Sequence, residues 1–129
     1  MFARKLFAGA VVAAVASIAG DAFAGASDYE FQPVRPLVKT GNVTIAVRLV
    51  HKPTGKPVPD AVVVRSRVDM SPDGMGQMAA PLTAAPSSQP GVYTFQTNLV
   101  MAGGWALKLM AKVQGEPDTI EGTVVFTAK

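Results

Sequence analysis

Apolar and polar residues alternate with a period of two along most of the chain after Gly25. The alternation is clearest in two runs, whose apolar members are Val43, Ile45, Val47 and Leu49 in the first and Trp105, Leu107, Leu109, Ala111 and Val113 in the second. Successive side chains of a β-strand point to opposite faces, so this period predicts strands with one face in a core. No helical stripe of useful length competes with this pattern.

Turns rich in glycine, proline, asparagine and aspartate separate the alternating runs. They divide the chain into seven predicted strands, at residues 30–39, 43–51, 61–70, 77–83, 91–99, 105–113 and 119–127. Short strands at this spacing are typical of an immunoglobulin-like antiparallel β-sandwich. Pro33 and Pro36 make the first run an edge strand, because proline cannot donate a hydrogen bond to a sheet ladder.

The N-terminus has the pattern of a secretory signal peptide. Arg4 and Lys5 precede an apolar run at residues 6–20, and small residues at Ala22 and Ala24 suit a signal peptidase. We therefore expect residues 1–24 to be removed after Ala24, leaving residues 25–129 as a single domain in the periplasm.

An uncleaved membrane anchor is the alternative for this segment. Its apolar run of about fifteen residues is shorter than the roughly 20 that span a bilayer. After cleavage, no segment is expected to insert stably in a membrane. A lipoprotein is excluded because the chain has no cysteine to receive the lipid.

Charge and cysteine content restrict the chemistry of the exported chain. Without Arg4, Lys5 and Asp21 it has 10 basic and 8 acidic residues, with no basic block, which argues against a nucleic acid partner. The absence of cysteine means that burial must hold the fold without disulfides. It also leaves methionine as the source of sulfur for any soft metal.

Three methionines, Met70, Met75 and Met78, lie within nine residues in a loop rich in glycine, proline and aspartate. In an antiparallel sandwich successive connections alternate between the two ends, so this loop shares an end with the connection that contains Met101. Trp105 begins the next strand. Four thioethers and an indole face are suitable ligands for copper(I) or silver, and they form the predicted metal site.

Each of these residues also has a purely structural interpretation. Trp105 has the inward parity of its strand, Met70 continues the parity of Val62, Val64 and Val68, and Met101 continues that of Leu99, so all three are candidates for core packing. Met75 and Met78 flank glycines in a polar turn, where no core is evident. They are therefore the strongest candidates for ligands.

Other site chemistries have less support. His51 is the only histidine and is predicted to lie in a surface loop at the far end from the methionines. Asp69 and Asp73 flank the methionine turn and are interpreted as turn residues. Neither a catalytic triad nor another enzyme motif is present, so we expect no enzymatic activity.

Several blocks along the chain resemble the YtkA-like or FixH-like small exported domains. They are residues 55–61, the Met/Gly loop, Pro90-Gly-Val-Tyr93 and residues 101–107. The resemblance implies an immunoglobulin-like sandwich in the bacterial envelope, without defined catalytic residues. Relatives often occur beside heavy-metal efflux or cytochrome oxidase assembly genes, and some are labelled auxin-binding proteins. FixH proper keeps a transmembrane anchor, whereas this chain is predicted to lose its leader.

Three functions remain open at this point. The leading interpretation is a non-enzymatic periplasmic protein that binds or passes copper(I) or silver and has no other cofactor. The first alternative is an interaction module whose methionines dock on an envelope efflux or oxidase component. The second is a binder of a small aromatic, auxin-like acid that uses Trp105, Tyr93 and Phe95.

Overall fold

The computed structural model describes residues 26–87 and 89–129. The predicted signal peptide, residues 1–24, and its cleavage position after Ala24 lie outside these residues. Within the described ranges, no helix is long and apolar enough to cross a membrane.

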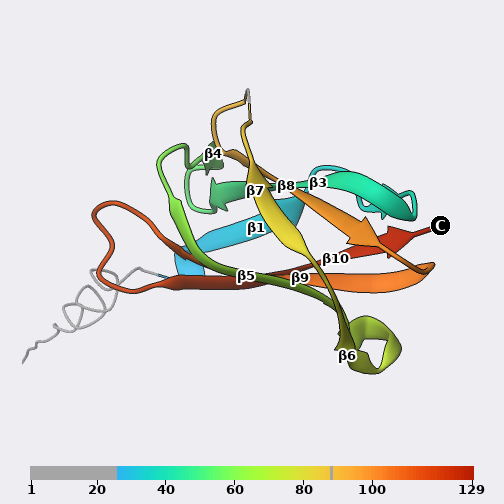
Figure 1. Ribbon diagram of the computed structural model, residues 1–129. Coiled ribbons are helices and arrows are strands. Elements are labelled where there is room, and N and C mark those ends of the chain that lie inside the picture. The colour runs from blue at the N-terminus through green and yellow to red at the C-terminus, as the bar shows by residue number, and fades with distance from the viewer. Residues whose placement is uncertain (1–25, 88) are drawn as a thin grey trace, which may run out of the picture.

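Two β-sheets form the described part of the chain, with β3 and β8 above β9 and β10 in Figure 1. The first sheet contains β1 (Tyr29–Pro33), β3 (Gly41–His51), β8 (Val92–Leu99) and β7 (Leu82–Ala85) in that order, with β4 (Lys56–Pro57) paired to β3. The second contains β2 (Leu37–Val38), β10 (Ile120–Ala128), β9 (Gly103–Lys112), β5 (Val62–Met70) and β6 (Met75–Ala80). Short 3₁₀ turns, η2 (Ala26–Asp28) and η3 (Ser71–Asp73), complete the described elements. The predicted immunoglobulin-like β-sandwich is confirmed.

The core lies between the two sheets and follows the predicted alternation. Inward residues of β3, β8, β9 and β10 are buried, among them Ile45, Leu49, Phe95, Trp105, Leu107 and Phe126. Their polar neighbours along each strand face outward, as in β9, where exposed Lys108 separates buried Leu107 from buried Leu109. Burial of these apolar side chains is the main stabilising contribution to the fold.

Two predicted strands are each divided between the sheets. The first becomes β1, which pairs antiparallel with β3, and β2, which pairs parallel with β10. The fourth becomes β6, paired with β5, and β7, paired with β8, with Pro81 between them. In both cases prolines interrupt the ladder, because they lack the N–H that a continued strand would donate. The prediction of single continuous strands was wrong at these two places.

The inward parity expected for the start of β5 was also wrong. Val62 and Val64 are 62% and 51% exposed, whereas Val68 and Met70 are fully buried. The register of β5 against β9 shifts between Val63 and Arg65, and such a bulge changes which residues face the core. Only the second half of the strand keeps the predicted parity.

Candidate functional site

The methionine segment contains the tight turn between β5 and β6. Met70 ends β5, the single turn η3 follows, and Gly74 at φ 77° reverses the chain so that Met75 pairs directly opposite Met70. Glycine suits this position because a left-handed backbone strains residues that have a Cβ. The Asp73-Gly74 pair is therefore a turn, as predicted, and it places two methionines side by side on adjacent strands.

This turn packs against the start of β9 and is hydrogen-bonded to it. The Gly104 N–H donates to Asp73 Oδ2 over 3.0 Å. A Cβ added to Gly103 would lie 2.7 Å from the terminal methyl of Met70, so the two segments are in close contact. The prediction that the Met70–Met78 loop and the Met101 connection share one end of the sandwich is confirmed. In Figure 1 this end lies at the lower right, beside β6.

The buried carboxylate of Asp69 holds the same turn in place. Asp69 is 1% exposed and accepts hydrogen bonds from Arg67 Nε over 2.8 Å, Lys108 Nζ over 3.1 Å and the Ser71 N–H over 3.0 Å. Arg67 also donates to the Gly76 carbonyl oxygen over 2.8 Å. Asp69 was interpreted from the sequence only as a turn residue. The cation at Lys108 is 39 residues away, so the sequence gives no local signal for this network.

The ionisation of Asp69 follows from these contacts. Burial by itself would raise the pKa of this carboxyl group, but the hydrogen bonds from Ser71, Arg67 and Lys108 outweigh burial and hold the pKa well below its usual range. Asp69 is therefore ionised and stabilises the turn that follows Met70.

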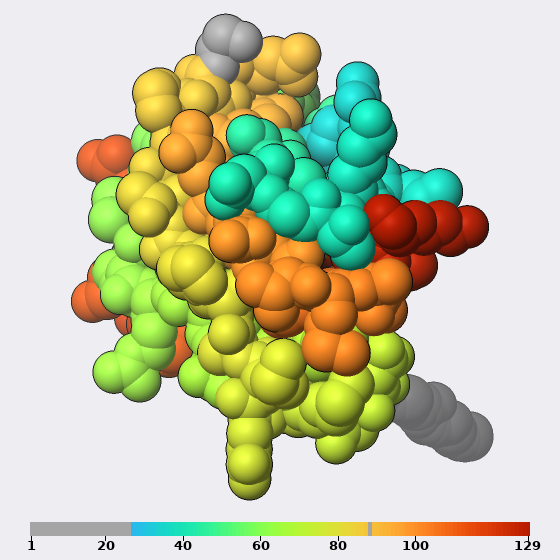
Figure 2. All heavy atoms as spheres, turned by 45° about the vertical axis from the view of Figure 1, so that its right-hand side comes forward, coloured from blue at the N-terminus to red at the C-terminus, as the bar shows by residue number. Residues whose placement is uncertain are grey.

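Three of the four predicted thioether ligands reach the surface. Met75, Met78 and Met101 are 36%, 37% and 39% exposed, whereas Met70 is fully buried. The ladder between β5 and β6 pairs Asp69 with Ala79 but Met70 with Met75, so the residues around Met78 bulge from the strand. In the space-filling view, the segment around residues 75–80 projects at the bottom of the molecule (Figure 2).

Core packing describes Trp105 and Met70, but it is wrong for Met101. Trp105 is fully buried in the core, and its indole N–H donates to the Met101 carbonyl oxygen over 3.0 Å. Met101 lies two residues beyond the end of β8, where strand parity no longer applies, and its side chain is therefore at the surface. Trp105 thus holds the backbone of Met101 rather than presenting its ring at the surface.

His51 lies away from this end, as predicted. It ends β3 next to β4, on the upper left in Figure 1, where its Nδ1 lies 2.9 Å from Thr54 Oγ1 and its ring packs 5.1 Å from the ring of Tyr29. Within residues 26–87 and 89–129, no group of three or more His, Cys, Asp or Glu side chains is arranged to hold a metal ion.

The residues proposed for an aromatic acid do not form one site. Tyr93 and Phe95 line an open hollow of about 620 Å³ together with residues 84–85 and 89–92. Trp105 does not line this hollow. The Tyr93 hydroxyl is engaged, since it donates to the Val58 carbonyl oxygen and accepts from the Ala61 N–H.

A match to a family model shows which protein family the chain belongs to. A family model described as YtkA-like matches residues 23–110, which covers β1 to β8 and most of β9. The chain belongs to the YtkA-like family. No curated protein matches this YtkA-like chain at a significant level.

Three solved structures are similar to the YtkA-like chain. The Lin-41 filamin domain is 18% identical with a TM-score of 0.44, and the alignment covers 77% of this chain and 97% of that domain. The ZirS C-terminal domain is 12% identical with a TM-score of 0.44 and coverages of 100% and 86%. The M1 domain from titin is 10% identical with a TM-score of 0.37 and coverages of 78% and 90%.

Proposed function

We propose that this YtkA-like protein is a non-enzymatic periplasmic protein that binds copper(I) or silver at its methionine-bearing end. The proposal rests on one observation: Met75 and Met78 on β6, and Met101 in the connection between β8 and β9, reach the surface at the same end of the sandwich and are 36–39% exposed. Thioethers are soft ligands and favour soft monovalent ions over zinc or other borderline ions. Neutral thioethers need no deprotonation, so such a site keeps its affinity in an acidic envelope.

Met70 and Trp105 support these ligands from within the fold. The terminal methyl of Met70 packs beneath Gly103, and Trp105 holds the carbonyl oxygen of Met101. Both contacts restrict the connection that presents the Met101 thioether. Restricting ligands before binding lowers the ordering cost of binding, which favours a defined site over loose association.

An anaerobic titration tests the metal proposal. The purified chain is mixed with copper(I) in competition with a chromophoric chelator, and Trp105 fluorescence is followed. A Met75→Leu/Met78→Leu double variant keeps volume but removes both sulfurs, and Met110→Leu, on the outer face of β9, is the matched control. We expect the double variant to lose at least about tenfold in affinity, with Met110→Leu unchanged. Equal affinities in all three proteins would refute the metal site.

A second function, docking on an envelope efflux or oxidase component, is favoured by Val100. This residue is 65% exposed next to Met101, and metal ligation does not explain an exposed valine. Val100 adds an exposed apolar side chain to the three exposed methionines at this end. Flexible methionine side chains can adapt their shape to a partner. A photo-reactive residue at position 78 would then crosslink to such a component in cells, whereas one at position 121, on the outer face of β10, would not.

The periplasmic location follows from the signal peptide that residues 1–24 are proposed to form. Cell fractionation should place the protein in the periplasm with Gly25 as its first residue. A membrane-bound protein that retains Met1 would show that the leader is an anchor.

A further inference from the structure

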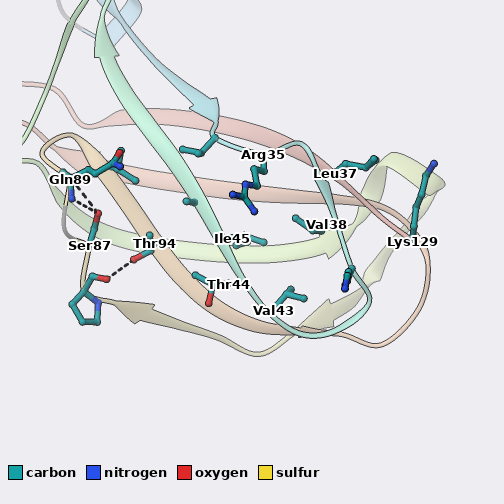
Figure 3. Close-up of a pocket in the computed structure, with 15 residues that line it drawn as sticks. Arg35, Leu37, Val38, Val43, Thr44, Ile45, Ser87, Gln89, Thr94 and Lys129 are labelled. Carbon is teal, nitrogen blue, oxygen red and sulfur yellow. Dashed lines mark hydrogen bonds between the residues drawn. The ribbon is translucent and has the colours of Figure 1, made fainter.

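A second hollow lies where the chain crosses from the first sheet to the second. Its volume is about 780 Å³, within the range of roughly 300–1,000 Å³ common for small-molecule sites. The connection between β1 and β2 forms one wall, and residues 43–46 of β3 form the floor (Figure 3). The other wall is formed by Pro86, Ser87, Gln89, Val92 and Thr94. It lies beside β2, at the opposite edge of the second sheet from β6 and its methionines.

Backbone hydrogen bonds hold the first wall in place. The Val34 N–H donates to the Ala46 carbonyl oxygen of the first sheet over 3.0 Å. The Thr127 N–H of the second sheet donates to the Pro36 carbonyl oxygen over 2.7 Å. Arg35 therefore lies between two residues anchored to different sheets, and Figure 3 shows its side chain directed toward β3. A wall held in this way is formed before any ligand arrives.

The hollow leaves apolar side chains in contact with water. Leu37 and Val34 are 57% and 38% exposed, and Val38 and Val43 continue the apolar surface toward the floor. Removing such surface from water favours the complex in proportion to the apolar area that is buried. An apolar ligand body would therefore gain free energy by covering these residues.

The charged side chains that line the hollow are cationic. Arg35 and Lys39 line it together with Lys129, and none of its lining residues is acidic. In the part of the chain that the structure describes, both ion pairs are made by Asp69, so Arg35 and Lys39 are in no ion pair there. An arginine guanidinium presents paired donors that match a carboxylate. The hollow thus combines an apolar lining with a site for one negative head group.

We propose that this hollow binds a fatty acid, with the carboxylate on Arg35 and Lys39 and the acyl chain along Leu37, Val38 and Val43. The charge selects an anion, and the apolar wall selects a hydrocarbon body. The site does not share residues with the methionine-bearing end, so it neither requires nor excludes metal binding there.

A competition experiment on the purified chain tests this site. A dansyl-labelled undecanoate serves as the fluorescent probe, and decanoate and uncharged decanol serve as competitors of equal chain length. We expect decanoate to displace the probe at a concentration at least about tenfold lower than decanol, because only the acid pairs with the guanidinium. Equal competition by the alcohol, or no displacement by decanoate, would overturn the proposal.

Three variants locate the site. Arg35→Gln should weaken decanoate binding about tenfold, whereas Arg65→Gln, an exposed arginine on β5, should leave it unchanged. Ala46→Phe fills the floor and should abolish displacement, with circular dichroism showing that the sheet is retained. Equal binding by the two arginine variants, or full binding by folded Ala46→Phe, contradicts the site. Displacement by an acidic extended peptide but not by decanoate would assign the hollow to a peptide instead.

Discussion

At the scale of the residue, the methionine-bearing end depends on Asp69. This carboxylate lies in the interior with only 1% exposure, yet its two cationic partners, Arg67 and Lys108, remain 51% and 45% exposed. The partners can return to water when the carboxylate is lost, so each ion pair contributes less than a fully buried one. The Ser71 N–H has no such freedom, because it is part of the turn that follows Met70.

Replacing Asp69 with alanine should therefore destabilise the protein by about 1–3 kcal/mol, mainly through the unpaired Ser71 N–H and the lost charge-assisted hydrogen bonds. Asp118→Ala, at an exposed position in the connection before β10, should change stability by less than about 0.5 kcal/mol. Urea unfolding of both variants measures the difference. Equal losses of unfolding free energy in the two variants would mean that Asp69 does not stabilise the turn.

The same carboxylate gives the stability a dependence on pH. Its pKa is lower in the folded protein than in the unfolded chain, so its stabilising effect is complete above the unfolded value of 3.8 and is lost as the pH falls through the folded value. The difference in unfolding free energy between the wild type and Asp69→Asn should be largest at neutral pH and should shrink below about pH 4. A difference that grows toward acid pH would contradict this assignment.

At the scale of the element, the contact between η3 and the start of β9 joins the two methionine connections. Gly103 has a φ of 139°, and a Cβ there would meet both Asp73 and the terminal methyl of Met70. Gly115 is a suitable comparison, because its φ is 91° but a Cβ there meets nothing within 4 Å. A residue with a Cβ would strain the backbone at both positions, but only at Gly103 would it also collide with Asp73 and Met70.

Gly103→Ala should consequently cost more than Gly115→Ala. Backbone strain contributes about 1–2 kcal/mol in both variants, and displacement of η3 adds a similar amount in Gly103→Ala alone. Thermal unfolding measures the two losses, and the copper(I) titration should show weaker binding only for Gly103→Ala. Identical behaviour of the two variants would show that η3 and β9 are not coupled.

At the scale of the whole molecule, metal binding to the folded state should raise stability by mass action. At a free silver concentration about 100 times the Kd, the gain is about 2.7 kcal/mol, which corresponds to a rise in Tm on the order of 10 °C. Thioethers do not titrate, so the rise should be similar at about pH 7 and pH 5. Calorimetry at the two pH values measures it, and a rise that disappears at the lower pH would point to histidine or carboxylate ligands instead.

Much of the fold could be predicted because it depends on local properties of the chain. Alternation with a period of two follows from strand geometry at each position, so the strands containing Ile45 and Leu107 were predicted correctly. Topology then placed the Met70–Met78 loop beside the Met101 connection. The bulge near Val64 could not be predicted, because it depends on how β5 fits against β9 rather than on the sequence of β5.

The positions of the candidate ligands could be predicted only in part. The sequence placed Met75 and Met78 in a loop without an evident core; both are at the surface, but they lie in strand β6 rather than in a loop. It did not separate the buried Met70 from the exposed Met101, because inward parity ends where a strand ends and the strand ends depend on pairing. The Asp69 network and the hollow at Arg35 had no local signal, since each combines segments far apart in the chain.

The sequence alone therefore determined the secondary structure class, the positions of most strands along the chain and the available chemistry, with methionine as the only source of sulfur. These depend on the residue types and their spacing. The tertiary structure decided where the prolines at 33, 36 and 81 transfer the chain between sheets, which methionines reach the surface and where Arg35 meets an apolar wall. These depend on contacts between distant segments, whose free energies exist only once the two sheets have packed.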